Sequence, residues 1–161
     1  MSDDPHRALK TAFGRYATGV TVVSCLGADG APTAITVNSF ASVSLSPPLV
    51  LWSIEKSAST FDRFMASPSY AVSVLRSDQQ DVSQRFAQHG GRGLDASEFE
   101  TWETGCPVLK ERMAGFDCKI IDRHVAGDHV VLIAEVLRFD LQQGAPLLYF
   151  DSAYAVGPKT R

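Results

Sequence analysis

The chain has 161 residues, 45% of them hydrophobic, and a formal net charge of −3 from 15 basic and 18 acidic side chains. This length suits one domain with a buried core, so we expect residues 1–161 to form a single unit. The charges form no basic block, which argues against a nucleic-acid or membrane-surface partner. Cys25, Cys106 and Cys118 are far apart and odd in number, as is typical of reduced thiols. Because we find no signal peptide and no apolar run of membrane-spanning length, we expect a cytoplasmic protein.

The predicted elements begin with an N-terminal helix, because Asp4 and Pro5 read as a cap and a first turn. Leu9, Phe13 and Tyr16 then recur at helical spacing, which predicts one buried stripe. Next come a strand at 20–23 and a turn at 27–30 that returns the chain through 32–40 as a hairpin. We expect further strands at 49–55, 70–76, 116–125, 130–141 and 147–154, and short helices at 59–66 and 81–89. Seven or so strands with few helices predict a closed or nearly closed antiparallel barrel.

Residues 130–134, with the sequence VVLIA, are apolar on both faces of their predicted strand. An antiparallel strand with one face in water would alternate apolar and polar side chains instead. The outer face of this strand therefore needs a cover. A second copy of the chain would supply it, since two-fold dimers are the commonest oligomers, and the alternative is that the helices alone provide the cover.

Residues 36–48 read TVNSFASVSLSPP, a run crowded with hydroxyl groups between apolar, strand-like segments. Ser42 and Ser44 alternate with Val43 and Leu45 in strand periodicity, but these side chains lack the bulk to fill a core from both faces. Small polar side chains also let a ligand approach the backbone closely. We therefore expect a flat, polar ligand against one face of this segment, and the plain alternative is a soluble, serine-rich edge strand.

Six blocks of sequence stand out along the chain. They are ATGVTVV at 17–23, DG at 29–30, the segment 36–48 with the following LVL, SAST at 57–60, RFA at 85–87 and GDH at 127–129. In this order and at these separations they resemble the flavin reductase family, the small reductase components of two-component flavin-dependent monooxygenases. The likeness covers nearly the whole chain. It implies a mainly β fold, namely an antiparallel Greek-key split β-barrel with a few short helices, in a homodimer with flavin at the interface.

The resemblance implies an NAD(P)H:flavin oxidoreductase that transfers a hydride from NADH or NADPH to FMN or FAD and supplies reduced flavin to a partner monooxygenase. Hydride transfer passes directly between the two ring systems, so we expect no catalytic residue that acts by side-chain chemistry. The implied flavin contacts are Thr36, Val37, Asn38, Ser39, Ser42, Val43, Ser44, Lys56, Ser57, Ser59, Thr60, Arg85, Phe86 and Ala87. At Ser39 we expect the backbone amide to matter more than the hydroxyl.

Within this set, residues 56–60 are expected to bind the ribityl phosphate. Free backbone amides and the dipole at the start of the helix predicted at 59–66 favour an anion there. Plain helix capping, with Ser59 and Asp62 in a capping box, is equally compatible with the pattern. Arg85 could pair with a phosphate, whereas Phe86 alone would more often belong to the core.

His129 follows Gly127 and Asp128 in a tight predicted loop, and the matching histidine of similar reductases lies against the nicotinamide. Tyr154 is a weaker candidate for the same pocket. A lone loop histidine is more often simply exposed. His124 and His129 lack a third ligand at recognisable spacing, so we expect no metal site.

Two other functions stay open from the sequence. The same barrel could hold flavin without turnover, as a carrier or sensor. An oxidase of the pyridoxamine-phosphate type shares the barrel but would need a basic pocket for a phosphorylated substrate. No Gly-x-Gly-x-x-Gly fingerprint is present, so a pyridine nucleotide would bind without a Rossmann domain and mainly through the exposed flavin face. The choices between FMN and FAD and between NADH and NADPH stay open.

Overall fold

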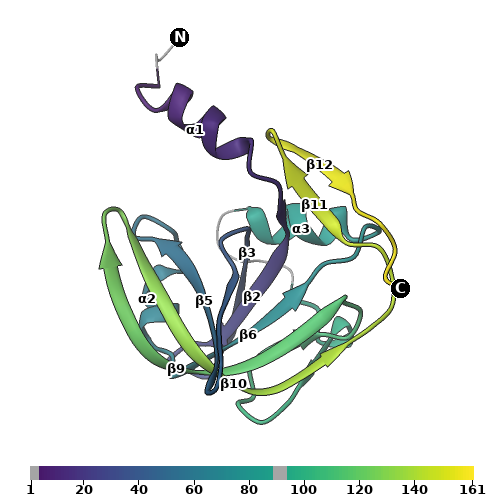
Figure 1. Ribbon diagram of the computed structural model, residues 1–161. Helices are drawn as coiled ribbons and strands as arrows, with labels where there is room; N and C mark the ends of the chain where they lie inside the picture. Colours follow the sequence, from purple (N-terminus) through teal and green to yellow (C-terminus); the bar gives the residue numbers. More distant parts are fainter. Residues whose placement is uncertain (1–3, 89–93) are drawn as a thin grey trace.

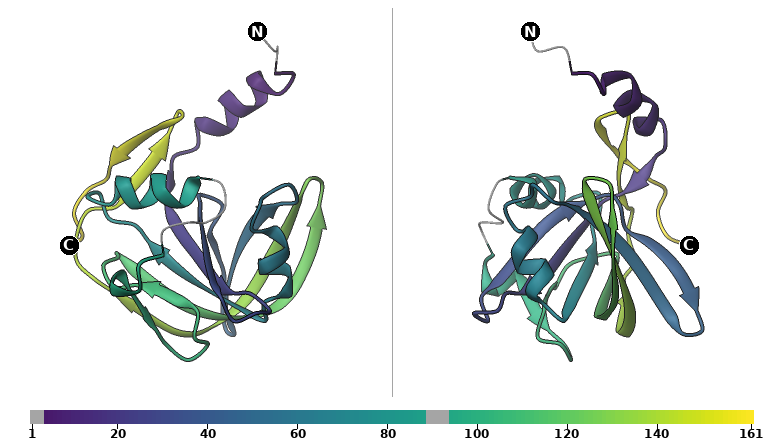
Figure 2. Two further views of the ribbon diagram at one scale, coloured as in Figure 1. Left: turned by 180° about the vertical axis from the view of Figure 1, so that it is seen from behind. Right: turned by 90° about the vertical axis from the view of Figure 1, so that its left-hand side faces the viewer.

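The computed structural model describes residues 4–88 and 94–161 (Figure 1). Its largest element is a strongly curved antiparallel sheet of seven strands in the order β3-β2-β6-β9-β10-β5-β4 (Figures 1 and 2). These strands are β2 (Thr21–Leu26), β3 (Pro32–Val37), β4 (Ala41–Leu45), β5 (Pro48–Glu55), β6 (Ser69–Val74), β9 (Ala114–Ala126) and β10 (His129–Leu141). The described residues are thus mainly β, which confirms the predicted fold class at this level.

Smaller elements surround the large sheet. β1 (Thr18–Gly19), β11 (Leu147–Phe150) and β12 (Ala153–Val156) form a second sheet, and β7 (Phe99–Thr101) pairs with β8 (Pro107–Leu109). The helices are α1 (Arg7–Gly14), α2 (Phe61–Ala66), α3 (Gln80–Ala87) and the 3-10 helix η1 (Ala96–Glu98). No helix within the described ranges is long and apolar enough to cross a membrane.

The main core lies between α2 and the inner face of the curved sheet. Trp52 of β5 is fully buried, and its ring packs edge-on against Phe64 of α2 at 4.8 Å and against Tyr70 of β6 at 5.9 Å. The Tyr70 hydroxyl donates to the carbonyl of Leu132 on β10, at 3.1 Å. Three strands and a helix are therefore held together around one aromatic cluster.

β10 contains the residues 130–134 that the sequence shows to be apolar on both faces of the strand. Val130, Leu132 and Ala134 point inward and are buried, while Val131 and Ile133 between them are half-buried on the outer face. β10 thus presents two neighbouring apolar side chains, Val131 and Ile133, on its outer face.

The hydroxyl-rich residues of the segment 36–48 belong to two different strands. β3 ends at Val37 and β4 begins at Ala41, and these two strands lie at opposite ends of the large sheet. Residues 38–40 therefore connect the two edges of the curved sheet. Strand periodicity could not reveal this crossing, because it reports alternation and not pairing partners.

The N-terminal helix does not bury its apolar stripe, so that prediction is wrong for the single chain. α1 contains no buried residue, and Leu9, Phe13 and Tyr16 are 51%, 69% and 79% exposed. The helix stands away from the large sheet (Figures 1 and 2). It is fastened near its end, where Asp151 donates its amide to the carbonyl of Gly14 at 2.8 Å.

The strand predicted at 147–154 is also wrong, since it is the hairpin of β11 and β12. Asp151 and Ser152 form its turn with φ of 50° and 63°, a conformation for which glycine or asparagine is the usual signal. β1, β7 and β8 are short strands that periodicity did not predict. The helices predicted at 59–66 and 81–89 are observed as α2 and α3, and His89 lies outside the described residues.

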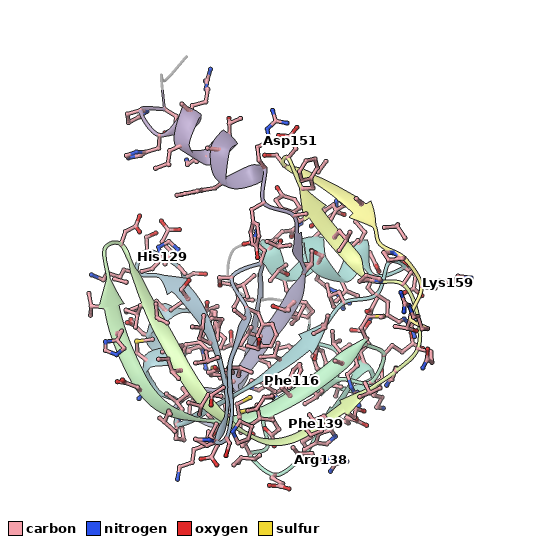
Figure 3. The ribbon with its side chains drawn as sticks, in the orientation of Figure 1. Phe116, His129, Arg138, Phe139, Asp151 and Lys159 are labelled. Atoms are coloured by element: carbon pink, nitrogen blue, oxygen red, sulfur yellow. The ribbon has the colours of Figure 1, made fainter. Side chains whose placement is uncertain are left out.

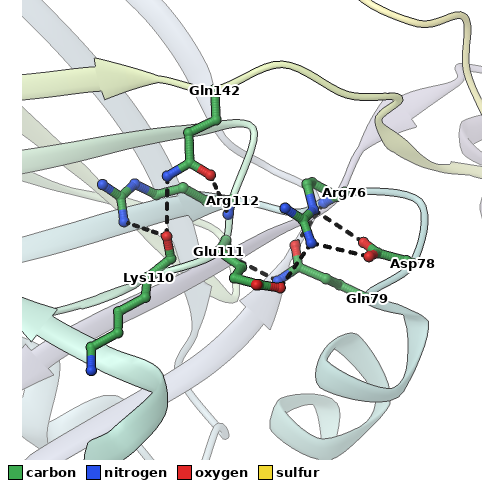
Figure 4. A network of polar contacts seen from close by, with 7 residues as sticks. All are labelled: Arg76, Asp78, Gln79, Lys110, Glu111, Arg112 and Gln142. Carbon is green, nitrogen blue, oxygen red and sulfur yellow. Dashed lines mark hydrogen bonds and ion pairs between the residues drawn. The ribbon is translucent and has the colours of Figure 1, made fainter.

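A polar network fixes the turn before α3 (Figure 4). Arg76 pairs with Asp78 at 3.0 Å and with Glu111 at 2.8 Å, and the Gln79 amide donates to the carbonyl of Glu111 at 2.8 Å. The Gln142 amide donates to the carbonyl of residue 110 at 3.1 Å. These contacts join α3, which carries residues 85–87, to the segment that follows β8.

Candidate functional site

Three adjoining pockets bring together most of the predicted site. The α2 pocket, of about 220 Å³, is lined by Ala34, Ile35, Glu55, Ser57, Ala58, Ser59, Thr60, Phe86, Ala87 and Gln88. The β3 pocket, of about 230 Å³, is lined by Val20, Thr36, Val37, Asn38, Ser83, Ala87, Tyr149 and Tyr154. The α1 pocket, of about 600 Å³, is lined by Lys10, Phe13, Gly14, Tyr16, Ala17, Thr18, Gly19, Asn38, Ser39, Phe40, Ala41, Tyr149 and Ser152.

Shared residues place these pockets in a row. Ala87 lines both the α2 and the β3 pocket, and Asn38 and Tyr149 line both the β3 and the α1 pocket. The row runs from the N-terminus of α2, past α3 and β3, to α1. A ligand longer than one pocket can therefore continue into the next.

The predicted phosphate segment lines the α2 pocket. Thr60 is the N-cap residue of α2, with no side-chain cap bond, so the expected Ser59–Asp62 capping box is out of register. Thr60 is 4% exposed, and its Oγ1 has no hydrogen-bond partner among the described residues. An unpaired buried hydroxyl is costly, so an acceptor or donor from a ligand would stabilise it. The Lys56 side chain is exposed.

Arg85 and Phe86 of α3 lie in different surroundings. The Arg85 guanidinium donates to both carboxylate oxygens of Glu98, at 2.7 and 3.1 Å, and this hydrogen bonding raises the pKa of Arg85 above its ordinary value. Phe86 is 1% exposed and packs in the core beside Phe99, while it also lines the α2 pocket. The position of the Arg85 guanidinium is thus fixed by its bidentate pair with Glu98.

The β3 pocket is built on a chain of hydroxyl groups. Thr36 Oγ1 donates to the carbonyl of Ser83 at 2.7 Å, and Ser83 Oγ and Tyr154 Oη share a hydrogen bond of 2.7 Å. β3, α3 and β12 are thereby joined around this pocket. Tyr154 and Tyr149 pack their rings 5.5 Å apart, so both tyrosines have defined positions.

The rest of the hydroxyl-rich segment divides into two parts. Ser39 lines the α1 pocket, and its hydroxyl both donates to the carbonyl and accepts from the amide of Ser53 on β5, each at 3.1 Å. Ser42, Val43 and Ser44 lie on the edge strand β4, where the pairing with β5 is irregular between Ser42 and Ser44. These three residues line none of the three pockets.

His129 lies at the tip of the hairpin of β9 and β10 (Figure 3). Its Nδ1 donates to the Asp128 carboxylate at 2.7 Å, and this bond holds the pKa of Asp128 below its ordinary value. The Asp128 carbonyl accepts from the Lys56 amide at 2.9 Å, which ties the hairpin tip to the predicted phosphate segment. The His129 side chain is 42% exposed and lines none of the three pockets, so the structure does not bring it together with Tyr154.

Sequence reasoning missed the residues from α1 and β1. Lys10, Phe13 and Tyr16 line the α1 pocket, as does Thr18, whose Oγ1 is buried and has no hydrogen-bond partner among the described residues. The stripe on α1 is visible in the sequence, but its spacing alone predicts only a face that is buried in the core. Only the position of the helix relative to residues 38–41 shows that this stripe faces a pocket.

The hydrogen-bonding groups that line these pockets fit a flavin. Hydroxyls and backbone groups predominate, with the unpaired Thr60 hydroxyl at one end and tyrosine rings in the middle. This arrangement suits a flat ring system that carries a polar, phosphorylated tail.

Residues 13–158 match the family described as Flavin reductase like domain. The chain belongs to this family. The resemblance inferred from the sequence is thereby confirmed. Several similar curated proteins are named as flavin reductases or as reductase components of monooxygenases. The "FMN reductase (NADH) SmoA" of Agrobacterium fabrum is 43% identical over 148 residues, which cover 92% of this chain and 84% of that protein.

Two further members extend this comparison. The reductase component of the "Flavin-dependent trigonelline monooxygenase" of Acinetobacter baylyi is 38% identical over 96% of this chain, which spans 50% of that longer protein. Among solved structures, the "NADH:FAD oxidoreductase SgcE6 in complex with NAD and FAD fragments" from Streptomyces globisporus has a TM-score of 0.86 and 35% identity. That match covers 94% of this chain and 93% of SgcE6.

Proposed function

We propose that this chain is an NAD(P)H:flavin oxidoreductase that reduces FMN or FAD and supplies reduced flavin to a partner monooxygenase. The observation that carries the proposal is the row of three pockets, which gathers most of the expected flavin contacts in a member of the flavin reductase family. SmoA and SgcE6 are named for the same chemistry, with NADH as donor. The trigonelline relative is named as the reductase component of a monooxygenase.

The flavin would lie along the α2 and β3 pockets. Ser57, Ser59 and Thr60 would hold the phosphate, with Lys56 as the nearest exposed cation in sequence. The residues from Thr36 to Ser39 would lie along the ring system, and Ser42, Val43 and Ser44 would approach it from the edge strand β4. Arg85, Phe86 and Ala87 would border the tail from α3. When bound, the flavin supplies a ring that accepts a hydride from reduced nicotinamide.

The chain's own residues would orient the two ring systems and exclude water. We propose that Tyr154 borders the β3 pocket on the side where the nicotinamide stacks and that His129 contacts the nicotinamide from the hairpin tip. Because His129 lies outside the pockets of the single chain, this contact requires the nucleotide to extend beyond them. No side chain is assigned a covalent or proton-transfer role.

We also propose that the active form is a homodimer of Greek-key split β-barrels. The half-buried outer-face residues Val131 and Ile133 support this proposal, since a second copy would remove them from water. The non-consecutive strand order, with β3 and β4 at opposite edges of one curved sheet, supports the barrel.

The test is stopped-flow absorbance with purified protein and either FMN or FAD. We expect NADH or NADPH to bleach the oxidised-flavin band only when protein is present, and the reduced flavin to support a separately purified flavin-dependent oxygenase. If neither nucleotide changes that band with protein saturated by flavin, the oxidoreductase proposal is wrong. Tight flavin binding in that case would identify a carrier or sensor instead.

A further inference from the structure

We infer that Ser83 is a positioning residue of the flavin site, because its hydroxyl group holds the Tyr154 ring in place as a wall of the β3 pocket. The inference rests on the proposed function, since the β3 pocket is where the flavin ring is proposed to lie. Ser83 belongs to none of the six sequence blocks that carry the family resemblance.

Ser83 is the polar residue on the buried face of α3. The buried residues of this helix are Val82, Ser83 and Phe86, and Ser83 is 0% exposed. Alanine would fill nearly the same volume and has a higher helix propensity than serine, whereas a buried hydroxyl group without a partner is costly. The Ser83 hydroxyl therefore contributes to the structure through its partner, which is Tyr154 Oη at 2.7 Å.

Tyr154 depends on this bond for its polar connection to α3. It lies on β12, which pairs with β11 at the edge of the three-stranded sheet. α3 lies beneath this hairpin in Figure 1. Because β12 reads AYAV, Tyr154 supplies its one polar side chain. The bond to Ser83 is thus the polar link between β12 and α3.

The Tyr154 side chain is held both at its ring and at its hydroxyl group. The ring packs edge-on against Tyr149, with the centroids 5.5 Å apart, and the hydroxyl group binds Ser83. Thr36 Oγ1 donates to the carbonyl of Ser83 at 2.7 Å, which fixes this turn of α3 against β3. All four residues line the β3 pocket. The wall formed by Tyr154 is therefore aligned with β3, along which the flavin ring is proposed to lie.

Two substitutions break the bond between Ser83 and Tyr154 from opposite ends. Ser83→Ala removes Oγ but keeps the carbonyl that Thr36 binds, so the link between β3 and α3 remains. Tyr154→Phe removes the hydroxyl group but keeps the ring. If Ser83 acts through Tyr154, the double variant should lose no more flavin affinity than either single variant.

Ser73→Ala is the matched control for the loss of a buried serine hydroxyl. Ser73 is 1% exposed, and its Oγ accepts from the amide of Leu109 at 3.0 Å, but it lines none of the three pockets. This variant should lower the free energy of unfolding, because a buried amide loses its partner. Flavin affinity should not change with it.

The experiment titrates FMN into purified protein and follows the fluorescence of the flavin, so it measures binding without turnover. We expect Ser83→Ala and Tyr154→Phe each to raise the dissociation constant for FMN about fivefold, and the double variant to raise it by the same factor. Ser73→Ala should stay within about twofold of the wild type.

The fluorescence that remains at saturation is a second readout, which a purely structural role of Ser83 would not change. A phenol ring in contact with a flavin quenches its fluorescence by electron transfer, so the signal reports how close the Tyr154 ring lies. We expect FMN bound to Ser83→Ala to be brighter than FMN bound to the wild type. In the Tyr154→Phe background, Ser83→Ala should cause no further change.

Several results would overturn the inference, once circular dichroism has shown that the variants are folded. One is a Ser83→Ala variant with unchanged FMN affinity. Another is a pair of losses that multiply in the double variant, which would show that Ser83 acts independently of Tyr154. A third is equal weakening by Ser73→Ala. If Ser83→Ala does not fold, a Tyr154→Phe variant that binds FMN as the wild type does would overturn the inference as well.

Failure of the proposed function would give a different result. Wild-type protein that binds FMN but is not reduced by NADH or NADPH would refute the oxidoreductase and leave the role of Ser83 to be decided by the titration. The two failures are therefore distinguishable.

Discussion

The Ser39 hydroxyl illustrates what a single residue contributes to the site. It donates a hydrogen bond to the carbonyl of Ser53 and accepts one from the amide of Ser53, so it satisfies the backbone groups of Ser53 as a neighbouring strand would. Ser39 lies where residues 38–40 connect the two edges of the sheet. The sequence predicted that Ser39 lies in the site but that its hydroxyl is expendable. The sequence could not predict that this hydroxyl binds the backbone of Ser53, because it does not show that β3 and β4 lie at opposite edges of the sheet.

Ser39→Ala should therefore be costly, contrary to the expectation from the sequence. We expect the free energy of unfolding to fall by about 1 to 3 kcal/mol, because the Ser53 carbonyl and amide both lose a partner. Flavin affinity should fall with it, since the connection at 38–40 loosens. Urea unfolding and fluorescence titration with FMN measure the two effects.

Ser42→Ala is the matched control, because Ser42 is an exposed serine on the edge strand β4. Its free energy of unfolding should stay within about 0.5 kcal/mol of the wild type. A Ser39→Ala variant as stable as Ser42→Ala would show that the two bonds to Ser53 contribute nothing.

At the scale of elements, the hairpin of β9 and β10 is the part of the fold that periodicity predicted well, because both strands are long. Its tip carries two connections that no pattern revealed. Asp128 binds the His129 ring with its carboxylate and the Lys56 amide with its carbonyl. The candidate nicotinamide contact and the candidate phosphate segment are thus linked through one residue.

His129→Ala should separate the two substrates. We expect flavin affinity to stay nearly unchanged and kcat/KM for the nicotinamide substrate to fall about tenfold to a hundredfold, because one oriented contact is lost. Fluorescence titration with flavin and single-turnover reduction of the same variant measure these effects. Weakened flavin binding with an unchanged reduction rate at saturation would place His129 in the flavin site.

Asp128→Asn is the companion variant, since it keeps the carbonyl that binds Lys56 and removes the charge beside His129. We expect a smaller loss in the same kinetic constant. Because the pKa of Asp128 is lowered, its carboxylate is charged at every pH above the ordinary pKa of a carboxyl group. The pair with His129 is lost only when the pH falls through the lowered pKa of Asp128. Titration of Asp128 should therefore leave no inflection in the wild-type rate between about pH 5 and 8.

At the scale of the whole molecule, the sequence predicted a mainly β fold and the family, and both are confirmed. It could not predict the second sheet, because β1 has only two residues and the turn between β11 and β12 uses Asp151 and Ser152 at positive φ. It also misjudged α1, since an amphipathic stripe shows that a helix face needs a cover but not what the cover is. Contacts distant in sequence determine both features.

The homodimer is the prediction that concerns the molecule as a whole. We expect light scattering of the wild type to give twice the mass of the chain, and Ile133→Glu to raise the dimer dissociation constant about tenfold or more, because a charge would be buried without a partner on the outer face of β10. Leu141→Glu is the control, since Leu141 ends the same strand and is 70% exposed.

Circular dichroism and thermal unfolding establish that each variant is folded, and Ile133→Ser offers a milder change if Ile133→Glu does not fold. A folded Ile133→Glu variant that remains as tightly dimeric as the wild type would remove this face from the interface. A wild type that is monomeric at all concentrations would refute the dimer itself.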